Sequence, residues 1–555
     1  MAVMTDARFF AEAMKGYGVT HVFFVPGILR RALVEMEELG ITRVLCHSEV
    51  AAAYMADGYA RGARRPGVVL TQTVGAANAA TGLRDAYLSY SPVIAVTGGP
   101  HPDSRYRHLY QQLEDFTMFD SVTKFNARVD KAERLPDLLR QAFREATTGT
   151  PRPVHLELSG RGGEGVQGEG DLELLVEEQY SSYPAIRPEP DKNRVDEAIG
   201  ILKAAQRPVI VLGGGVVASD AGPELVKLAE RLSIPVVTSL NGKAAIPNDH
   251  PLHIGVVGVY SRACANRVVA EADLVFFAGS GAGSMVTNLW KIPRPGTPVI
   301  QMDINPAEIG RNYQVRVGLV GDAKVTLQRL IEAAGTEQAR PSWVRRAQEL
   351  REEWRASVAA MYNSDAVPMR PERICKEVAE SLHDDAALVA CTSHAAIWSG
   401  TMIDLKGPNH RYIRCGGTLG WGFPGAIGVK CALPNKPVVC FTGDGGIFYH
   451  LSELETCARL GINLVVVVNN NHALAQTTTN LFAAYGERSQ DRSDELWVFK
   501  DVNFATVAEE MGCMGIRVTH PSEIRGAMEA AFAANRPVVI DAVSDRKAMP
   551  PKAWA

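Results

Sequence analysis

The sequence predicts an α/β protein built from three doubly wound parallel-sheet domains. Its 555 residues correspond to about three domains at roughly 150 to 200 residues each. Short apolar runs alternate with amphipathic helical stretches along most of the chain, and this alternation is typical of βαβ units. Two segments, 161–190 and 367–371, interrupt the alternation with Gly, Pro and charged residues. They therefore divide the chain into three α/β units.

Composition narrows the class of protein further. The chain has 46% hydrophobic residues, 22% charged residues and a net charge of −4, which excludes a disordered or fibrous protein. No charge run marks a nucleic-acid or membrane partner. The nine cysteines form no C-x-x-C pair, and neither a signal peptide nor an apolar run of about 18 residues is found. We expect a cytoplasmic protein without disulfides or structural zinc.

The first domain is expected over residues 1–165. Four apolar runs predict buried strands separated by helices, at 22–25, 68–71, 93–97 and 154–158. The connector 161–190 follows.

The second domain is expected over residues 190–340. It opens with a buried strand at 207–212 that leads into three glycines, 213–215. A charged helix at 343–361 then connects it to a third domain, expected over residues 366–545. The third domain has apolar runs at 438–442, 464–468 and 537–542.

The most informative motif is Gly443-Asp444-Gly445-Gly446, which lies between an apolar strand and a helical stretch. A glycine turn at that place lets backbone N–H groups bind phosphate oxygens. Asn471 ends an Asn run after the next apolar strand, 27 positions beyond Asp444. One carboxylate and one amide oxygen at two strand ends suit Mg²⁺ that also binds a diphosphate.

Together these residues resemble the metal and diphosphate motif of thiamine diphosphate (ThDP) enzymes. The resemblance implies that Mg²⁺ is held by Asp444, Asn471 and the backbone carbonyl of Ala473. It also places Gly443, Gly445 and Gly446 against the diphosphate.

A second motif lies in the first domain, at residues 47–61. A glutamate before a small-residue helix commonly interacts only with the helix dipole. The whole segment, however, resembles the cofactor-activating glutamate segment of ThDP enzymes, and Glu49 falls at the glutamate. In that family the carboxyl group hydrogen-bonds the cofactor's pyrimidine ring and favours the tautomer that removes the thiazolium proton. Glu49 is therefore expected to be catalytic.

Further segments carry the same resemblance. Leu419, in the glycine-rich segment 414–428, matches the apolar residue that bends the cofactor, as its reacting groups must meet. Gln112 matches a pocket glutamine and is counted with Glu49 as catalytic. The remaining residues expected to bind the cofactor are Val74, Asn78, Thr392, Ser393, His394 and Gly417.

The resemblance covers nearly the whole chain and is strongest to the acetolactate synthase large-subunit type of the decarboxylase and carboligase superfamily. It implies a pyrimidine-binding N-terminal domain, a central Rossmann-like domain and a diphosphate-binding C-terminal domain. The implied reaction cleaves a C–C bond of a 2-oxo acid or related ketone and transfers the acyl group to an aldehyde or ketone. The sequence departs from the family at the expected substrate pocket, at Ile28, Arg30, Arg31 and Gln476.

Two other functions remain open: a decarboxylase or C–C lyase or hydrolase, and a catalytically silent structural or regulatory homologue. Because Glu49 and Asp444 lie in different domains, the resemblance implies active sites at the interface of a homodimer or homotetramer. FAD also remains open: residues 213–215 and Asp303 are compatible with it, but the family's flavin-segment arginine is missing from 279–284.

Overall fold

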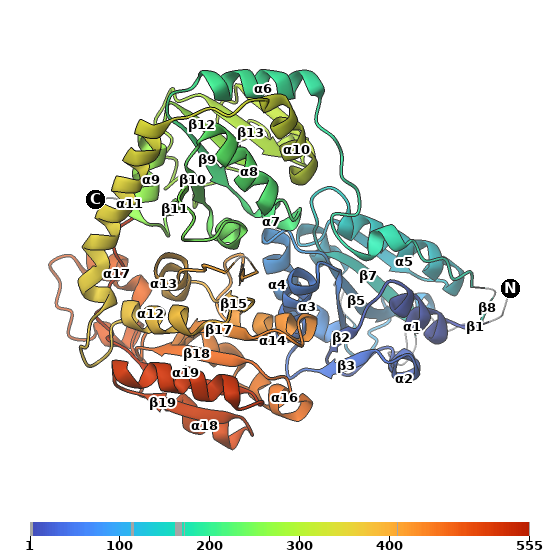
Figure 1. The fold of residues 1–555 in the computed structure, drawn as a ribbon. Coiled ribbons are helices and arrows are strands. Elements are labelled where there is room, and N and C mark those ends of the chain that lie inside the picture. Colours follow the sequence, from blue (N-terminus) through green and yellow to red (C-terminus); the bar gives the residue numbers. More distant parts are fainter. Residues whose placement is uncertain (1–3, 113–115, 161–168, 171, 408, 554–555) are drawn as a thin grey trace.

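The computed structural model describes residues 4–112, 116–160, 169–170, 172–407 and 409–553. It contains three six-stranded sheets in which every strand pairing is parallel. Figure 1 shows the three sheets in three lobes, with helices packed around each sheet. The predicted fold class is therefore confirmed. Part of the predicted connector, 161–168 and 171, lies outside the described residues.

The N-terminal sheet has the strand order β3-β2-β4-β5-β7-β6. Buried Val, Ile, Leu and Ala residues run through its central strands, as expected for strands covered on both faces. Its strands are β2 (His21–Phe24), β3 (Thr42–Leu45), β4 (Gly67–Thr71), β5 (Val93–Pro100), β6 (Phe125–Val129) and β7 (Val154–Gly160). Its helices are α1 (Asp6–Gly16), α2 (Arg30–Glu38), α3 (Glu49–Ala63), α4 (Thr73–Leu88) and α5 (Leu135–Thr147). The short strands β1 (Met4–Thr5) and β8 (Glu169–Gly170) form a separate antiparallel pair.

The central sheet has the order β11-β10-β9-β12-β13-β14. Its strands are β9 (Pro208–Leu212), β10 (Val236–Thr238), β11 (His253–Val256), β12 (Leu274–Ala278), β13 (Val299–Asp303) and β14 (Val317–Val320). Its helices are α6 (Lys192–Ala204), α7 (Gly214–Ala218), α8 (Gly222–Leu232), α9 (Ala263–Glu271) and α10 (Ala323–Ala334). In chain order this sheet reads 3-2-1-4-5-6, the classic dinucleotide-binding arrangement.

The C-terminal sheet has the order β16-β15-β17-β18-β20-β19. Its strands are β15 (Ala387–Ala390), β16 (Arg411–Arg414), β17 (Val438–Gly443), β18 (Val465–Asn470), β19 (Met514–Val518) and β20 (Val538–Val543). Its helices are α12 (Pro371–Ser381), α13 (His394–Met402), α14 (Gly422–Ala432), α15 (Asp444–Ile447), α16 (Glu453–Leu460), α17 (Thr478–Tyr485), α18 (Phe504–Glu510) and α19 (Ile524–Ala533). Counted within each domain, the N-terminal and C-terminal sheets share the order 2-1-3-4-6-5.

The lobes are joined by one long helix and by shared apolar cores. Helix α11 (Pro341–Tyr362) runs along the outside from the central to the C-terminal lobe (Figure 1). It buries Trp343 and Trp354 in a core cluster that also contains residues of both lobes. Across the other junction, a Cβ on Gly58 of α3 would lie 2.0 Å from the Gly425 carbonyl oxygen of α14. Backbone contact between these helices fixes the N-terminal lobe against the C-terminal lobe.

Two further properties of the described part of the chain bear on its surroundings. None of its helices combines the length and apolar character needed to cross a membrane. All nine cysteines are buried and unpaired.

Candidate active site

A pocket lies at the carboxyl edge of the C-terminal sheet, at the ends of β15 and β17. The strand order reverses between these two strands, so the loops that leave them diverge and open a crevice. Loops after β15, β17 and β18 supply most of the lining. The described lining residues are Cys391, Thr392, Ser393, His394, Ala395, Leu419, Gly443, Asp444, Gly445, Gly446, Asn469, Asn471, Ala473, Leu474, Ala475 and Gln476.

Two side-chain oxygens converge inside this pocket. Asp444 is only 3% exposed, and its Oδ2 accepts a hydrogen bond from the Ala473 N–H at 2.8 Å. The Oδ1 of Asn471 accepts from the same N–H at 3.1 Å. Burial raises the pKa of Asp444 to about 7, opposed by the N–H groups that donate to it. A carboxylate and an amide oxygen at one place are the donor set that Mg²⁺ takes.

The same pocket holds an unsatisfied acceptor. Asn469 is 3% exposed, and its Oδ1 is buried without a hydrogen-bond partner among the described atoms. Such groups are rare in folded proteins and indicate a missing partner such as a ligand or water. Close by, a Cβ on Gly446 would lie 2.7 Å from Thr442 Oγ1. Little space is therefore left for a side chain at Gly446, in the short helix that follows β17.

The segment 392–394 connects β15 to α13 in an unusual conformation. Ser393 has φ +65° and ψ −146°, a backbone region that residues other than glycine seldom occupy and that clusters at functional sites. Its hydroxyl donates to the Oε1 of Gln476 at 2.5 Å. His394 is buried, and burial lowers its pKa to about 4. Its ring is therefore neutral at neutral pH.

The loop that carries Leu419 is held by a buried carboxylate that the sequence analysis missed. Asp85 of α4 accepts backbone N–H bonds from Gly416 at 2.7 Å, Gly417 at 3.1 Å and Thr418 at 2.8 Å. Leu419 lines the pocket, whereas Gly417 serves as part of this anchor. Nothing in the sequence marks Asp85, because an Asp in a helix is usually a surface charge.

Glu49 lies at the start of α3, against the first turn of α4. The Nδ2 of Asn78 donates to its Oε2 at 3.1 Å, and a Cβ on Gly75 would lie 2.4 Å from its Oε1. Val74, in the same turn, is 47% exposed. The structure thus groups Glu49, Val74 and Asn78 at the edge of the N-terminal sheet.

The remaining candidate residues lie apart from the C-terminal pocket. Ile28 is buried, and a Cβ on Gly98 would lie 2.7 Å from its Cγ2. Arg30 and Arg31 are exposed at the start of α2. Gln112 is half-buried in the loop after β5. None of the four lines either of the two pockets described here.

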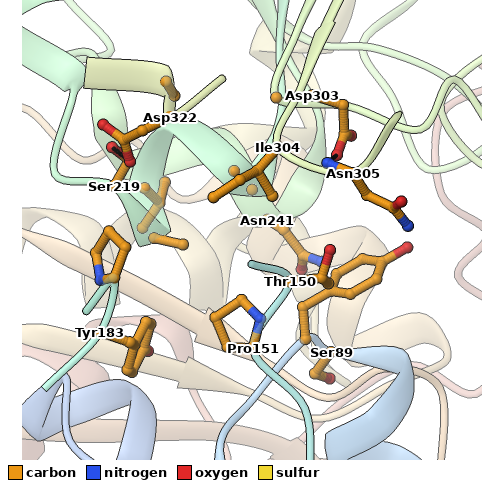
Figure 2. Close-up of a pocket in the computed structure, with 18 of the residues that line it drawn as sticks. Ser89, Thr150, Pro151, Tyr183, Ser219, Asn241, Asp303, Ile304, Asn305 and Asp322 are labelled. Atoms are coloured by element: carbon orange, nitrogen blue, oxygen red, sulfur yellow. Dashed lines mark hydrogen bonds between the residues drawn. The ribbon is translucent and has the colours of Figure 1, made fainter. Parts of the chain in front are cut away.

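A second, larger cavity lies where the three lobes meet, with a volume of about 190 Å³. In Figure 2, Ser219 and Asp322 lie on one side, Asp303 and Asn305 on the other, and Ile304 between them. Ser89, Thr150 and Pro151 of the N-terminal lobe also line the cavity. The cavity lies at the carboxyl ends of β9 and β12, where the order of the central sheet reverses.

The glycine turn of this cavity matches a nucleotide-binding pattern, and a buried acidic residue lies in the same cavity. A Cβ on Gly213 would lie 2.1 Å from the Gly279 carbonyl oxygen, so the turn after β9 is packed too closely for a side chain. Asp303 ends β13, and burial raises its pKa to about 6. In doubly wound sheets a glycine turn at the reversal point holds a pyrophosphate, and an acidic residue about 20 positions further on holds the ribose. Asp303 departs from this spacing, because it ends the fifth strand of the sheet, 90 positions after Gly213.

Two of the parallel sheets carry glycine turns at the points where their strand order reverses, one beside buried oxygen ligands and the other beside a nucleotide-type cleft. These features define a cofactor-dependent α/β enzyme. The profiles of three domains match this chain: "Thiamine pyrophosphate enzyme, N-terminal TPP binding domain" over residues 4–118, the "central domain" of the same family over 195–330, and its "C-terminal TPP binding domain" over 392–542. Thiamine pyrophosphate is another name for ThDP.

Full-length relatives agree with these matches. The chain is 33% identical to a "Probable acetolactate synthase large subunit" of Methanocaldococcus jannaschii, over 98% of this chain and 92% of that protein. It is 29% identical to the "Acetolactate synthase isozyme 3 large subunit" of Escherichia coli, over 98% of this chain and 96% of that one. The chain belongs to the thiamine pyrophosphate enzyme family.

Proposed function

We propose that this protein is a ThDP- and Mg²⁺-dependent carboligase of the acetolactate synthase type, acting in the cytoplasm. It takes a 2-oxo acid as donor and transfers the acyl group to an aldehyde or ketone acceptor. The observation that carries the proposal is the convergence of Asp444 and Asn471 on the Ala473 N–H, at a sheet edge lined by a glycine turn. The full-length similarity to acetolactate synthase large subunits supports the reaction type.

The residues of the C-terminal pocket would hold the diphosphate and its metal. Asp444 and Asn471 offer side-chain oxygens, and the Ala473 carbonyl is the third proposed ligand. The glycine turn and the amino-terminal end of α13 offer N–H groups for phosphate oxygens. The proposed cofactor contacts of Thr392, Ser393 and His394 agree with their position in the lining. When bound, ThDP supplies the nucleophilic carbon that attacks the 2-oxo group.

The proposed catalytic residue Glu49 is not part of that pocket. Every described residue that lines it lies between 391 and 476, so no part of the N-terminal lobe contributes. The cavity measures about 40 Å³, far below the ~300 to 1,000 Å³ of pockets that enclose cofactor-sized ligands. We therefore propose a homodimer or homotetramer, in which the Glu49 edge of one subunit completes the pocket of another.

We propose that the central cavity receives the adenosine diphosphate half of FAD. Its close glycine turn admits a phosphate beside backbone, and the buried Asp303 carboxylate in the same cavity would accept a hydrogen bond from a ribose hydroxyl. Purified protein should show flavin absorbance or gain it on adding FAD. Asp303→Ala should then weaken FAD binding at least tenfold, as measured by quenching of flavin fluorescence.

The carboligase proposal is tested by product analysis. Purified protein with ThDP and Mg²⁺ is given pyruvate alone, then a panel of 2-oxo acids with and without acceptor aldehydes, and the products are identified by mass. A ThDP-dependent ligated product supports the proposal, whether the acceptor is a second molecule of pyruvate or an added aldehyde. An aldehyde formed equally with or without an acceptor identifies a decarboxylase or lyase instead. No ThDP-dependent product from any donor would identify a silent homologue.

A further inference from the structure

A chain of hydrogen bonds leads out of the C-terminal pocket into the central lobe. The Ser393 hydroxyl donates to the Oε1 of Gln476 at 2.5 Å. The Nε2 of Gln476 donates in turn to the Tyr260 hydroxyl at 2.6 Å. Ser393 and Gln476 both line the pocket, whereas Tyr260 comes from the loop between β11 and α9 of the central sheet. This chain joins three loops from two lobes.

Two hydrogen-bond donors remain unused in this chain. A Gln amide carries two N–H donors and a Tyr hydroxyl one. Gln476 uses one N–H on Tyr260, and Tyr260 accepts that bond, so its own O–H is not consumed by it. Among the described residues no acceptor is recorded for the second N–H or for the Tyr260 hydroxyl hydrogen. The chain therefore presents two neighbouring donors.

The other described residues of the pocket lining are mostly oxygen acceptors or apolar groups, so hydrogen-bond donors matter there. Asp444 and Asn471 supply oxygen acceptors at the proposed metal position, which suits a cation. No Lys or Arg is found among the described lining residues, and burial keeps the ring of His394 neutral. At this wall of the pocket an anionic substrate group would therefore meet neutral donors, and those of Gln476 and Tyr260 belong to the hydrogen-bond chain that begins in the lining.

The Tyr260 loop is held rigidly from both lobes. Asn266 exchanges hydrogen bonds with the backbone of Gly258, at 2.7 Å and 2.9 Å. Next to Tyr260 along the chain, Val259 N–H donates to the Met285 carbonyl at 2.8 Å. Arg262 donates from Nε to the Thr401 carbonyl of α13 at 2.8 Å. Because these bonds position the loop in advance, a donor on it costs little ordering entropy when it binds a ligand.

We propose that Tyr260, together with Gln476, is a specificity-determining residue that binds the carboxylate of the 2-oxo acid substrate. Two adjacent donors match the two oxygens of a carboxylate, and bonds to a charged acceptor are about twice as strong as neutral ones. The inference rests on the proposed carboligase function, because it assigns the substrate-binding end of the same site.

The test measures binding without turnover. Oxamate, an inert carboxylate analogue of pyruvate, and ethyl oxamate, its uncharged ester, are titrated by calorimetry into protein saturated with ThDP and Mg²⁺. Tyr260→Phe should weaken oxamate binding roughly 10- to 100-fold, the effect of losing a bond to a charged group. Affinities for ethyl oxamate and for ThDP should change less than threefold. In steady-state assays the loss should appear in KM for the 2-oxo acid, with kcat nearly unchanged.

Tyr313→Phe is the matched control, because it also removes a hydroxyl from a partly buried tyrosine of the central lobe. The Tyr313 hydroxyl donates to the Ile292 carbonyl at 2.9 Å and lies outside the pocket lining. This variant should bind oxamate as the unchanged protein does. Gln476→Met should weaken oxamate binding as Tyr260→Phe does, and the double variant should lose less than the product of the two single losses, since both act on one group.

Three results would overturn the inference: equal oxamate affinity in Tyr260→Phe, an equal loss of ThDP affinity, or no oxamate binding by the unchanged protein. The second would assign the chain of bonds to the diphosphate or to structure alone. Failure of the carboligase proposal would instead appear as a missing ligated product with the unchanged protein.

Discussion

Single buried polar residues decide the local geometry of this protein. Asp85 is fully buried yet receives three backbone N–H bonds from the Leu419 loop, which satisfy a carboxylate that would otherwise be costly to bury. Lys243 is likewise buried, and it donates to the carbonyls of Ser399, Gly400 and Ile403 at the end of α13. Each of these side chains fixes an element that borders the candidate active site.

Glu49 carries the clearest catalytic prediction at this scale. Glu49→Gln keeps the size of the side chain but removes the exchangeable proton, so kcat should fall on the order of 10²-fold or more. The rate of deuterium exchange at the thiazolium C2 of bound ThDP, followed by NMR, should fall in parallel. The exposed Glu133 provides the control variant Glu133→Gln. An exchange rate within threefold of the unchanged protein would refute the role of Glu49.

His155 makes stability depend on pH. Its ring is fully buried, stacks on Phe119 at 3.6 Å and hydrogen-bonds Thr97 and Asn126, each at 2.7 Å. Burial, with a smaller contribution from Arg128, lowers the pKa of His155 to about 3. The unfolded chain has its ordinary histidine pKa near 6.5. The stability contributed by the neutral ring is therefore present above pH 6.5 and is lost progressively as pH falls toward 3.

His155→Asn removes this titration. The variant should be less stable than the unchanged protein at pH 6.5, and this difference in unfolding free energy should shrink by about 1 kcal/mol per pH unit as the pH is lowered from 6.5 to 5. Urea unfolding curves of both proteins across this range measure the deficit. The control is His108→Asn, at an exposed position with φ +55° that Asn also tolerates. Its difference from the unchanged protein should stay constant. A constant deficit for His155→Asn would contradict the assignment.

At the scale of elements, the crossing of α3 and α14 matters most. α3 begins at Glu49, and α14 follows the Leu419 loop, so their contact positions both parts of the proposed site. The contact depends on missing side chains, since a Cβ on Gly428 would lie 1.9 Å from the Met55 carbonyl oxygen. Backbone cannot move aside as a flexible side chain can.

Gly428→Ala should therefore separate the two helices. We expect the unfolding free energy, measured by denaturant unfolding, to fall by about 1 to 3 kcal/mol. The dissociation constant for ThDP, measured by calorimetry, should rise. Gly526→Ala on α19 is the control, because nothing lies within 4 Å of its added Cβ. That variant should be unchanged or more stable by up to about 1 kcal/mol, since alanine favours a helix. Equal stability of the two variants would show that the crossing adapts.

At the scale of the whole molecule, two of the three sheets place a candidate site at the reversal point of their strand order. Gly443 and Ser393 lie at that point of the C-terminal sheet, and Gly213 at that of the central sheet. Within a single chain, Glu49 is not among the described residues that line the C-terminal pocket. We therefore expect that active sites form between subunits.

Mixing two inactive variants tests this expectation. The Glu49→Gln and Asp444→Ala homo-oligomers are each expected to be inactive, but a mixed dimer would contain one site with both residues intact. Unfolding and refolding an equal mixture should restore about a quarter of the original activity, because half of the dimers are mixed and each has one working site. Refolding each variant alone is the control. No recovery in the mixture would place Glu49 and Asp444 of one chain in the same site.

The sequence by itself determined the fold class and predicted part of the C-terminal pocket, including Asp444 and Asn471. Buried parallel strands are continuous apolar runs, so β4, β9, β17 and β18 could be located from the order of residues along the chain. Strand ends carry the local motif that makes Asp444 and Asn471 recognisable. Short or partly polar strands such as β3 and β6 lack that signal, and the sequence analysis did not single them out.

Only the tertiary structure decided how segments distant in the chain meet. Asp85 reaches the Leu419 loop over more than 300 residues, and Tyr260 reaches Gln476 over 216. Neither residue has a local pattern, because a hydrogen bond between lobes depends on where packing brings two loops together. The physical reason is that periodicity and turn chemistry report on neighbours along the chain, whereas a binding site is made of neighbours in space.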